Sequence, residues 1–425
     1  MSEVRLALDN VIEQYRVDLE IPDPAQIYAI LGAMAANHFN NSHPVWLVVV
    51  GPPSSGKSDP LKCLDVLPAV QFASEVSQGG LLSCSPRKER NPGSTGGLLT
   101  KMGAFGILVI SDMSPTLSMH PENLGKFLSL MRDVYDGRVI RHAGQDGGQT
   151  REWTGKMGLI AAATGDIDRH HSVINALGDR YLYFRMPAGN INDKMWRAHG
   201  RKSNAKAIRA AIASLFGFIA MADQPEIAVE TAKTLQGVAK FVAITRTAVI
   251  REGVARTIEF LPQPEEPVRL YLVLKTLYCG LIYIGLSETE AMGIVTKVAL
   301  DSLPPARLMA IKTVLGSVVP ATMKAMMGQK GDVFSETTVR RALEDLECFR
   351  VLTKVGENGI PAHYYPSDWL SRSVAELPEG TFSEISSITL EEEEKRPLSS
   401  IEDVFGVVAD KSEKVGDDSS TPTEK

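Results

Sequence analysis

The most chemically specific segment of this chain is a glycine-rich run that follows a short apolar stretch. Residues 46–50 read Trp-Leu-Val-Val-Val, and residues 51–58 then fit the pattern G-x-x-x-x-G-K-S. Two glycines let the backbone turn so that its N–H groups face a phosphate chain. The lysine adds a charge for the β- and γ-phosphates, and the serine hydroxyl can bind Mg²⁺. The run predicts a P-loop for Mg-ATP made of Gly51, Pro52, Pro53, Ser54, Ser55, Gly56, Lys57 and Ser58.

A second metal ligand is predicted at the end of another apolar stretch. Residues 106–110 read as a strand that ends at Ser111-Asp112. A carboxylate beside a P-loop can hold the Mg²⁺ shell, so Ser58 and Asp112 are the predicted metal site and Lys57 and Asp112 are catalytic candidates. The next residue is Met113, where many such ATPases carry a catalytic glutamate. We therefore expect slow hydrolysis or a base from elsewhere, with Glu75 as one alternative.

Two further residues stand at the ends of predicted strands. Thr164 follows residues 159–163 and either senses the γ-phosphate, positions water, or merely caps the strand. Arg180 precedes residues 181–186 and is predicted to reach a neighbouring subunit's γ-phosphate as an arginine finger. The alternative for the arginines around this strand is an ion pair with Asp168 or Asp179.

Arg269 follows the proline-rich stretch 261–267 on a predicted helix. We expect it to contact ATP from the same subunit; the alternative is a salt bridge with Glu265 or Glu266.

Residues 138–153 form two alternating runs around a glycine-rich tip, which predicts a β-hairpin. Arginine with histidine or aromatic neighbours suits a nucleic-acid backbone. The candidate DNA-binding residues here are Arg138, Arg141, His142 and Arg151. The tip itself is not basic, so a purely structural hairpin is the alternative.

The elements that must position these residues alternate between apolar strands and helices. Strands predicted at 46–50, 69–72, 106–110, 159–163 and 181–186 indicate an α/β fold with a five-stranded parallel sheet, whose ligands sit at the carboxyl ends of the strands. We assign residues 1–25 to an N-terminal helical segment and residues 26–190 to the P-loop core. Residues 191–302 form a helical lid, with helices predicted at 208–221, 231–254, 267–286 and 288–300.

Residues 303–372 predict a winged-helix domain. Helices at 306–315, 322–327 and 335–348 precede a hairpin at 351–365, whose turn is Asn358-Gly359. A recognition helix would present Thr337, Thr338, Arg340 and Arg341 to duplex DNA, and Lys354 and His363 would reach phosphates. However, Glu336, Glu344, Asp345 and Glu347 share this helix and would repel DNA, and winged helices also bind proteins.

Composition adds a charge asymmetry. The net charge is −6, and residues 376–425 alone carry −9, which leaves +3 for the rest. We expect residues 373–425 to be a disordered acidic tail in which residues 401–408 are the only apolar island. The four cysteines, Cys63, Cys84, Cys279 and Cys348, have no metal-ligand spacing. No membrane segment or signal peptide is evident, so the cytoplasm is the expected compartment.

Taken in this order, the P-loop, the strand ending in Asp112, the hairpin before the fourth strand and the arginine after it resemble the AAA+ ATPases. Within them the match is to the clade with a pre-sensor-1 hairpin, which includes the MCM and superfamily III helicases. The segments 127–137, 153–160 and 177–180 resemble ATPases of phages and other mobile elements that are described as helicase- or primase-associated replication proteins. The resemblance spans roughly residues 25–300.

The resemblance implies a subunit ring, commonly a hexamer, with ATP at each interface and the hairpin 138–153 facing single-stranded DNA in a pore. Lys57, Ser58, Asp112, Thr164, Arg180 and Arg269 would take nucleotide roles. Met113 departs from the family pattern, and the chain holds no primase domain, so a primase would be a separate partner. The expected function is an ATP-driven DNA motor. The alternatives are an ATP-switched DNA-binding loader with little hydrolysis, and a regulator that binds one duplex sequence.

Overall fold

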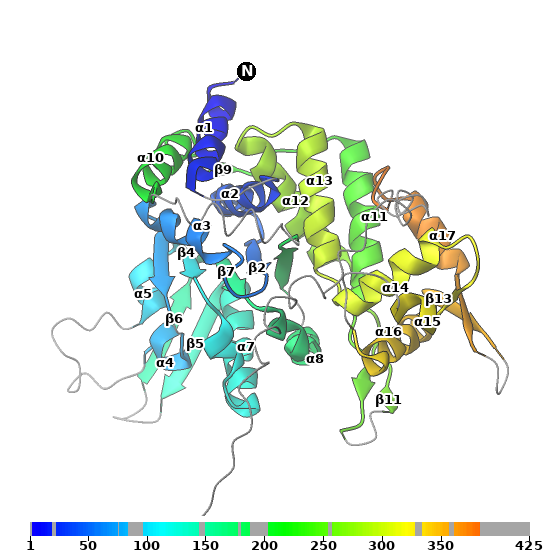
Figure 1. Cartoon of the computed structure of the whole chain (residues 1–425). Coiled ribbons are helices and arrows are strands. Elements are labelled where there is room, and N and C mark those ends of the chain that lie inside the picture. The colour runs from blue at the N-terminus through cyan, green and yellow to red at the C-terminus, as the bar shows by residue number, and fades with distance from the viewer. Residues whose placement is uncertain are drawn as a thin grey trace, which may run out of the picture. The chain divides into compact units, whose positions relative to one another are not determined.

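Five strands form the central sheet, and all of them are parallel (Figure 1). In spatial order they are β3 (Val70–Ala73), β4 (Phe105–Ile110), β7 (Lys156–Ala163), β2 (Trp46–Val50) and β8 (Tyr181–Arg185). All five residues of β2 are buried, as expected for a central strand covered on both faces. Each predicted strand is confirmed to within three residues at either end.

The computed structural model describes residues 2–18, 23–74, 76–83, 97–143, 149–176, 180–187, 203–253, 257–327, 334–356 and 361–382. Several predicted features lie outside these stretches: Glu75, Cys84, the hairpin tip at 144–148, residues 177–179, the turn Asn358-Gly359, and residues 383–425 with the apolar island 401–408.

Two groups of helices flank the sheet. In the first, α1 (Glu3–Asp18) packs against α10 (Ala205–Phe216), and α10 also contacts the 3₁₀ helix η1 (Cys63–Val66). In the second, the buried helix α2 (Ala25–Asn37) packs against α12 (Val268–Tyr283), which also contacts α11 and α13. The predicted lid at 191–302 is thus divided, because α10 belongs with the N-terminal helix.

The other lid helices are α11 (Val229–Arg246) and α13 (Glu288–Asp301). The helix predicted at 231–254 is too long, because α11 ends at Arg246. Ile250–Arg251 instead form strand β10, which pairs with β11 (Ile258–Phe260) in a short antiparallel hairpin. The alternation of β-branched residues in this stretch is compatible with a strand as well as with a helix, so its periodicity did not decide between them.

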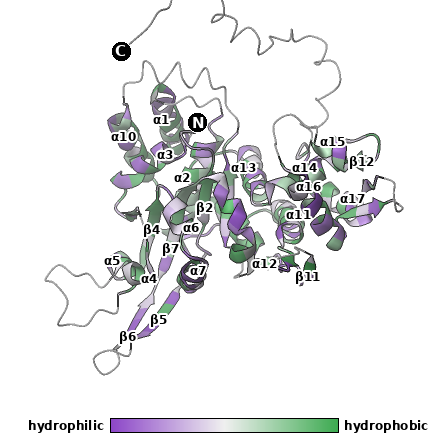
Figure 2. Ribbon diagram, turned by 60° about the horizontal axis from the view of Figure 1, so that its bottom comes forward, coloured by the Kyte–Doolittle hydropathy of each residue, from purple (hydrophilic) through white to green (hydrophobic). Residues whose placement is uncertain are grey.

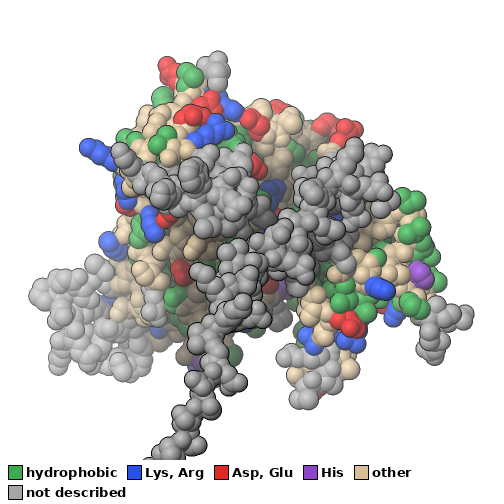
Figure 3. Space-filling model, in the orientation of Figure 1, with side chains coloured by type: hydrophobic (Ala, Val, Ile, Leu, Met, Phe, Trp, Pro, Cys, Tyr) green, Lys and Arg blue, Asp and Glu red, His purple; other side chains and the backbone are tan. Residues whose placement is uncertain are grey.

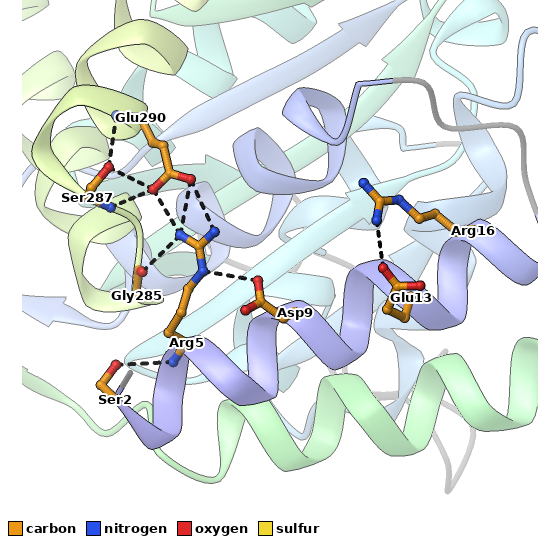
Figure 4. A network of polar contacts seen from close by, with 8 residues as sticks. All are labelled: Ser2, Arg5, Asp9, Glu13, Arg16, Gly285, Ser287 and Glu290. Atoms are coloured by element: carbon orange, nitrogen blue, oxygen red, sulfur yellow. Dashed lines mark hydrogen bonds and ion pairs between the residues drawn. The ribbon is translucent and has the colours of Figure 1, made fainter.

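An ion pair fixes α1 to the first turn of α13 (Figure 4). Both terminal nitrogens of Arg5 donate to the Glu290 carboxylate, the closest contact being 2.8 Å. Ser287 and Glu290 also form a reciprocal capping box at the start of α13. Hydrogen bonds from Arg5 and Ser287 lower the pKa of Glu290 to about 2.

The C-terminal elements follow the predicted order. Three helices, α14 (Pro305–Gly316), α15 (Met323–Met327) and α16 (Glu336–Cys348), precede strands β13 (Leu352–Val355) and β14 (His363–Pro366). A further short strand, β12 (Ala321–Thr322), pairs with β14, which gives a three-stranded sheet in the order β12-β14-β13. Ser335 caps α16 as predicted, since its hydroxyl accepts a hydrogen bond from the backbone N–H of Thr338 at 3.2 Å.

The predicted start of the disordered tail, residue 373, is too early. Helix α17 (Asp368–Ala375) packs against α11, and Trp369 stacks on Phe241 with the ring planes 5° apart. Leu377 is buried, and Phe382 lies edge-on to Phe241. Trp369 belongs to α17, whereas Leu377 and Phe382 follow the end of that helix at Ala375. Because these apolar side chains are spaced among polar residues, composition alone conceals the packing of this segment.

A hairpin lies between α7 (Pro121–Tyr135) and β7, as predicted. Its strands are β5 (Arg138–Ala143) and β6 (Gln149–Thr154), and Figure 2 shows them extending beyond the sheet as a largely hydrophilic pair. The remaining short elements are β1 (Phe39–Asn40), α3 (Ser58–Lys62), α4 (Gln78–Leu81), α5 (Leu98–Met102), α6 (Ser114–Leu117), η4 (Gly165–His170), α8 (His171–Ala176) and β9 (Ala222–Asp223).

Within the described stretches, no helix has both the length and the apolar character that a bilayer crossing requires. Cys63, Cys279 and Cys348 are free thiols.

Candidate nucleotide site

The P-loop connects the carboxyl end of β2 to α3. Gly51 N–H donates to the carbonyl of Ala163 at 3.1 Å, which fixes the start of the loop to β7. Ser54 and Gly56 have φ angles of 61° and 85°, the left-handed region in which a loop backbone can form a concave anion site. Gly51 is required for a different reason: a Cβ there would lie 2.9 Å from the side chains of Met186 and Ser55.

Two side chains of the loop are held in place by backbone carbonyls. The ammonium group of Lys57 donates to Pro52 O at 3.1 Å, and Lys57 is only 8% exposed. The hydroxyl of Ser58 donates to Ser111 O at 2.9 Å. The bond from Ser58 to Ser111 joins the P-loop to the carboxyl end of β4. The predicted metal residues Ser58 and Asp112 therefore lie at the same edge of the sheet.

Asp112 is oriented by the turn that follows it. One carboxylate oxygen, Oδ1, accepts hydrogen bonds from Ser114 N at 2.9 Å and from Ser114 Oγ at 2.7 Å. These bonds do not involve Oδ2, and the residue is exposed. The Asp-x-Ser turn thus fixes the carboxylate while one oxygen stays available to a cation. The sequence carried this signal, because an Asp two residues before a Ser is typical of such a turn.

The position after Asp112 offers no base. Met113 is buried, and its N–H donates to Ala162 O at 2.8 Å. Thr164 follows β7, and its hydroxyl lies 3.5 Å from the Asp166 carboxylate, at the limit of a hydrogen bond. Asp166 in turn is 3.4 Å from Arg169. Thr164 therefore lies at the carboxyl edge of the sheet as predicted, and the described contact of its hydroxyl, to Asp166, is long.

The helix after the P-loop is short. α3 has five residues and continues as the four-residue 3₁₀ helix η1, which ends before Leu67-Pro68. A residue before proline is driven out of the helical region, so the chain cannot continue the turn. Since the macrodipole depends on aligned peptide units, α3 adds less positive potential than a full helix would.

Arg180 lies at the other edge of the sheet, at the start of β8. Its guanidinium is 3.2 Å from both oxygens of Asp136 and 5.3 Å from the centre of the Tyr135 ring. Among the described residues its ion-pair partner is Asp136, and Asp179 lies outside them. Arg185 at the end of β8 takes Asp168 instead, at 2.7 Å and 2.9 Å.

Arg269 lies at the same amino edge as Arg180. It lines a hollow of about 320 Å³ together with His43, Glu265 and Val268, and His43 lies three residues before the start of β2. Since β2 is five residues long, roughly 13 Å of strand separates this edge from the P-loop of the same chain. Arg269 thus lies at the edge opposite the P-loop of its own chain. Of the two glutamates named as alternative partners, Glu265 binds Arg246 at 2.7 Å, and Glu266 lines the same hollow as Arg269.

Several positive groups share this edge. Burial lowers the pKa of His43 and that of Arg180, and the nearby charge of Arg269 lowers both further. A second hollow, of about 520 Å³, is lined by His43, Asp136 and Lys156 among others. Lys156 donates to Phe39 O and to Ser42 Oγ, and burial lowers its pKa to about 8.

The hairpin residues predicted to bind DNA do not share one face. Arg138 pairs with Glu152 at 2.8 Å, and His142 hydrogen-bonds Thr150, both on the outer face. Arg141 is different, because its guanidinium donates to Gln78 O at 2.8 Å and to Leu82 O. Arg141 therefore ties the hairpin to α4 and is not presented to a phosphate. Arg151 lies directly opposite it in the register.

The exposed residues of α16 are Glu336, Thr337, Thr338, Arg340 and Glu347, and Arg341 is partly buried. Two of the carboxylates expected to repel DNA are neutralised inside the chain. Arg251 of β10 contacts Glu344 at 2.8 Å and Asp345 at 2.6 Å, and Arg307 of α14 contacts Asp345 at 2.8 Å.

No sequence signal marked this cluster, since its arginines lie 38 and 94 residues from Asp345. On the wing, Lys354 lines a hollow of about 620 Å³ with Arg350 and Arg372, and His363 pairs with Thr322 in the sheet.

The chain matches no protein-family model and no curated protein sequence. Among solved structures it is similar to a full-length MCM homologue from Methanopyrus kandleri, with 14% identity and a TM-score of 0.40. That likeness covers 71% of this chain and 60% of the homologue, so this chain spans less than two thirds of its length. The chain is also similar to the C-terminal region of NrS-1 in an apo form, with 11% identity, a TM-score of 0.25, and coverage of 86% and 76%. Neither likeness carries a functional conclusion, which depends on the chain's own residues.

Proposed function

We propose that this chain is a Mg-ATP-dependent AAA+ motor that acts on DNA. The observation that carries the proposal is the joining of the P-loop to the end of β4. The Ser58 hydroxyl bonds Ser111 O at 2.9 Å, so the P-loop segment that holds Lys57 and Ser58 lies beside the residue that precedes Asp112. A lysine, a hydroxyl and an oriented carboxylate at the carboxyl edge of a parallel sheet are the groups that hold Mg²⁺ and a triphosphate.

The order of the sheet supports the AAA+ assignment. Counting core strands along the chain, β2, β3, β4, β7 and β8 take the spatial order 5-1-4-3-2. The hairpin β5–β6 is inserted directly before β7, the strand that ends at Thr164. This is the position of the pre-sensor-1 hairpin in the MCM and superfamily III helicases that the sequence resembles.

The positions of the arginines support an assembly with shared sites. Arg180 and Arg269 lie at the amino edge, too far from their own P-loop to reach its nucleotide. In the proposed ring, both would contact the nucleotide of a neighbouring subunit and neutralise charge that develops at its γ-phosphate. Arg269 is thus proposed to act on the neighbour's ATP rather than on its own.

The DNA contacts are proposed for two places. The outer face of the hairpin, with Arg138 and His142, would face a single strand in the pore. The C-terminal helices and three-stranded sheet would act as a winged helix in which α16 meets duplex DNA. Neutralisation of Glu344 and Asp345 by Arg251 and Arg307 removes two of the four carboxylate charges expected to repel DNA, while Glu336 and Glu347 remain exposed.

The test is ATP turnover by the wild type and by Lys57→Ala, each with and without single-stranded DNA. Lys62→Ala is the matched control, because Lys62 is exposed and its ammonium group pairs with the acidic surface residue Asp59. We expect DNA to stimulate the wild type and the control, and Lys57→Ala to lose roughly 100-fold or more in turnover. Unchanged turnover in Lys57→Ala would refute the proposal.

A second function is favoured by one observation. Met113 is buried where a catalytic glutamate would stand, so a base is lacking at that position. An ATP-switched DNA-binding loader would assemble on DNA with Mg-ATP but show negligible turnover and no strand separation. ATP turnover that is stimulated by single-stranded DNA would favour the motor over the loader.

A further inference from the structure

Lys156 is a largely buried amine that pairs with no carboxylate among the described residues. Its side-chain nitrogen donates to Phe39 O at 2.6 Å and to Ser42 Oγ at 2.8 Å, and both acceptors are uncharged. Burial without a counter-charge disfavours the ammonium form, which lowers the pKa of Lys156 from the ordinary lysine value of 10.5 to about 8. A substantial fraction of this side chain is therefore a neutral amine near pH 7.5.

The hydrogen bonds around the nitrogen suit a neutral amine. Such an amine carries two N–H groups and one lone pair, whereas an ammonium group carries three N–H groups. Two N–H groups match the two acceptors, Phe39 O and Ser42 Oγ, and the lone pair then points away from both of them. An ammonium group would have one N–H more than the described acceptors. The neutral form is thus held in one orientation by the fold.

A hollow of about 520 Å³ at the amino edge of the sheet gives access to this amine. Lys156 and Ser42 both line it. Asn41, His43 and Asp136 line it as well, and these three residues are exposed. A small electrophile can therefore reach the amine from solvent through the hollow.

The titratable groups near the amine supply no counter-charge to it. Burial lowers the pKa of His38 and of His43, so both rings are neutral at pH 7.5. Burial raises the pKa of Tyr135, on whose ring His43 stacks, so the phenol is neutral as well. The carboxylate of Asp136 pairs with Arg180, at 3.2 Å. The surroundings from α2, α7 and the residues before β2 thus favour the uncharged amine.

We propose that Lys156 is an acylation site, at which an acyl thioester transfers its acyl group to the side-chain nitrogen. The lone pair of the nitrogen forms a C–N bond with the thioester carbonyl carbon, the C–S bond breaks, and the sulfur leaves as a thiolate. The nitrogen then releases one proton, which the thiolate takes, so the products are a neutral amide and a free thiol. The inference is independent of the proposed function.

Acylation would change how the start of β7 is held. Lys156 follows Gly155, whose N–H donates to Gly137 O at 3.0 Å where the two strands of the β5–β6 hairpin meet. An acylated nitrogen keeps a single N–H, so it can no longer donate to both Phe39 O and Ser42 Oγ. The modification would therefore weaken the link between residues 39–42 and the root of the hairpin.

The test compares lysines within one protein. The full chain is incubated with the uncharged thioester S-acetyl-N-acetylcysteamine, and peptide mass spectrometry follows acetylation of each lysine over time at several pH values. Lys62 and Lys206 are internal controls, because both are exposed. Figure 3 shows Lys and Arg side chains at the surface over α1 and α10, and α10 is the helix that carries Lys206.

The expected difference follows from the fraction of neutral amine. Near pH 7.5, an amine with a pKa of about 8 is roughly one-quarter neutral, and one with the ordinary lysine value of 10.5 is about 0.1% neutral. A less basic nucleophile is also a weaker one, which offsets roughly 10-fold of this difference. We expect Lys156 to be acetylated about 10-fold faster than Lys62 and Lys206, with a rate that levels off above about pH 8.

A charge placed beside the amine gives a second test. In Ser42→Asp a carboxylate replaces the hydroxyl that accepts from Lys156 and favours the ammonium form, so acetylation of Lys156 should slow by about 10-fold near pH 7.5. Ser42→Ala adds no charge and should not slow it. Acetylation of Lys62 and Lys206 should be unchanged in both variants, and thermal unfolding checks that each variant is folded.

Any of three results would overturn the inference. The first is a wild type in which Lys156 is acetylated no faster than Lys62 and Lys206. The second is a rate at Lys156 that keeps rising through pH 9 in parallel with the control rates. The third is an unchanged rate in Ser42→Asp, since the neutral amine would then not be the reacting form.

Discussion

Mixing two inactive variants tests whether Arg269 serves a neighbour's nucleotide. Lys57→Ala removes the phosphate-binding charge from a subunit's own P-loop, and Arg269→Ala removes the cation at the opposite edge. Each variant alone is expected to lose nearly all turnover, because every shared site then lacks one of the two groups. In a mixed ring, some interfaces combine an intact P-loop from an Arg269→Ala subunit with an intact Arg269 from a Lys57→Ala subunit.

The recovered activity follows from the geometry. Arg269 lines a hollow with His43, three residues before the start of β2, and the P-loop leaves the other end of that strand. If Arg269 acts only on a neighbour, an interface is competent when an Arg269→Ala subunit supplies the P-loop and a Lys57→Ala subunit supplies the arginine. Random mixing in equal amounts then makes about one quarter of interfaces competent in a closed ring.

The assay is steady-state ATP turnover with saturating single-stranded DNA, as the ratio of the two variants is varied at constant total protein. We expect a maximum near the equal mixture, at about a quarter of the wild-type rate if sites act independently. A mixture no more active than its two components would refute the arrangement, because an arginine acting on its own subunit's ATP cannot be restored by a neighbour. A Lys62→Ala subunit mixed with wild type should leave the rate unchanged.

Three further outcomes are expected. Asp345→Asn leaves two arginines around Asp345 without their shared carboxylate, so urea unfolding should show a loss of about 3–5 kcal/mol, against little change for the exposed Glu347→Gln. Because the pKa of Glu290 is lowered to about 2 in the folded state, its contribution is present above its ordinary pKa of 4.5 and is lost as pH falls toward 2. Glu290→Gln should therefore lower the free energy of unfolding by roughly 1 kcal/mol at pH 7 and by progressively less below pH 4.5. Urea unfolding at several pH values measures this, and the control Glu13→Gln should leave the free energy of unfolding unchanged at each pH. Arg141→Ala should destabilise the fold by roughly 1.5–3 kcal/mol without changing the salt dependence of DNA binding, whereas a weakened salt dependence would return Arg141 to the DNA contacts.

The sheet and the P-loop were predictable because their signals are local. Each core strand is a short run of mostly apolar residues, with β-branched or aromatic side chains prominent in β2, β4 and β8, and such runs identify buried strands wherever they pair. The P-loop requires particular residues at fixed spacing, since Ser54, Gly56 and the lysine after it act within one turn of backbone. The capped start of α16 at Ser335 is equally local, and its position was predicted correctly.

The pairing of charges was not predictable in the same way. Arg141 alternates with apolar residues on a strand and looks like its neighbour Arg138, yet it binds two carbonyls of α4. Arg269 was placed on the correct helix, but the edge of the sheet at which that helix begins depends on how α12 packs against α2. Such contacts join residues far apart in the chain, and a single sequence carries no record of which distant partner a given cation takes.

The same consideration changes the interpretation of α16. Judged by sequence, its four carboxylates make it a poor recognition helix, because each would repel phosphates. In the folded chain Glu344 and Asp345 are paired with Arg251 and Arg307. The charge that α16 presents to solvent therefore comes mainly from its other charged residues. Arg251 belongs to the β10–β11 hairpin, so one arginine both neutralises part of the helix proposed to meet duplex DNA and holds that hairpin against it. Any displacement of the hairpin would therefore change the charge environment of α16 and with it the DNA contact proposed for this helix.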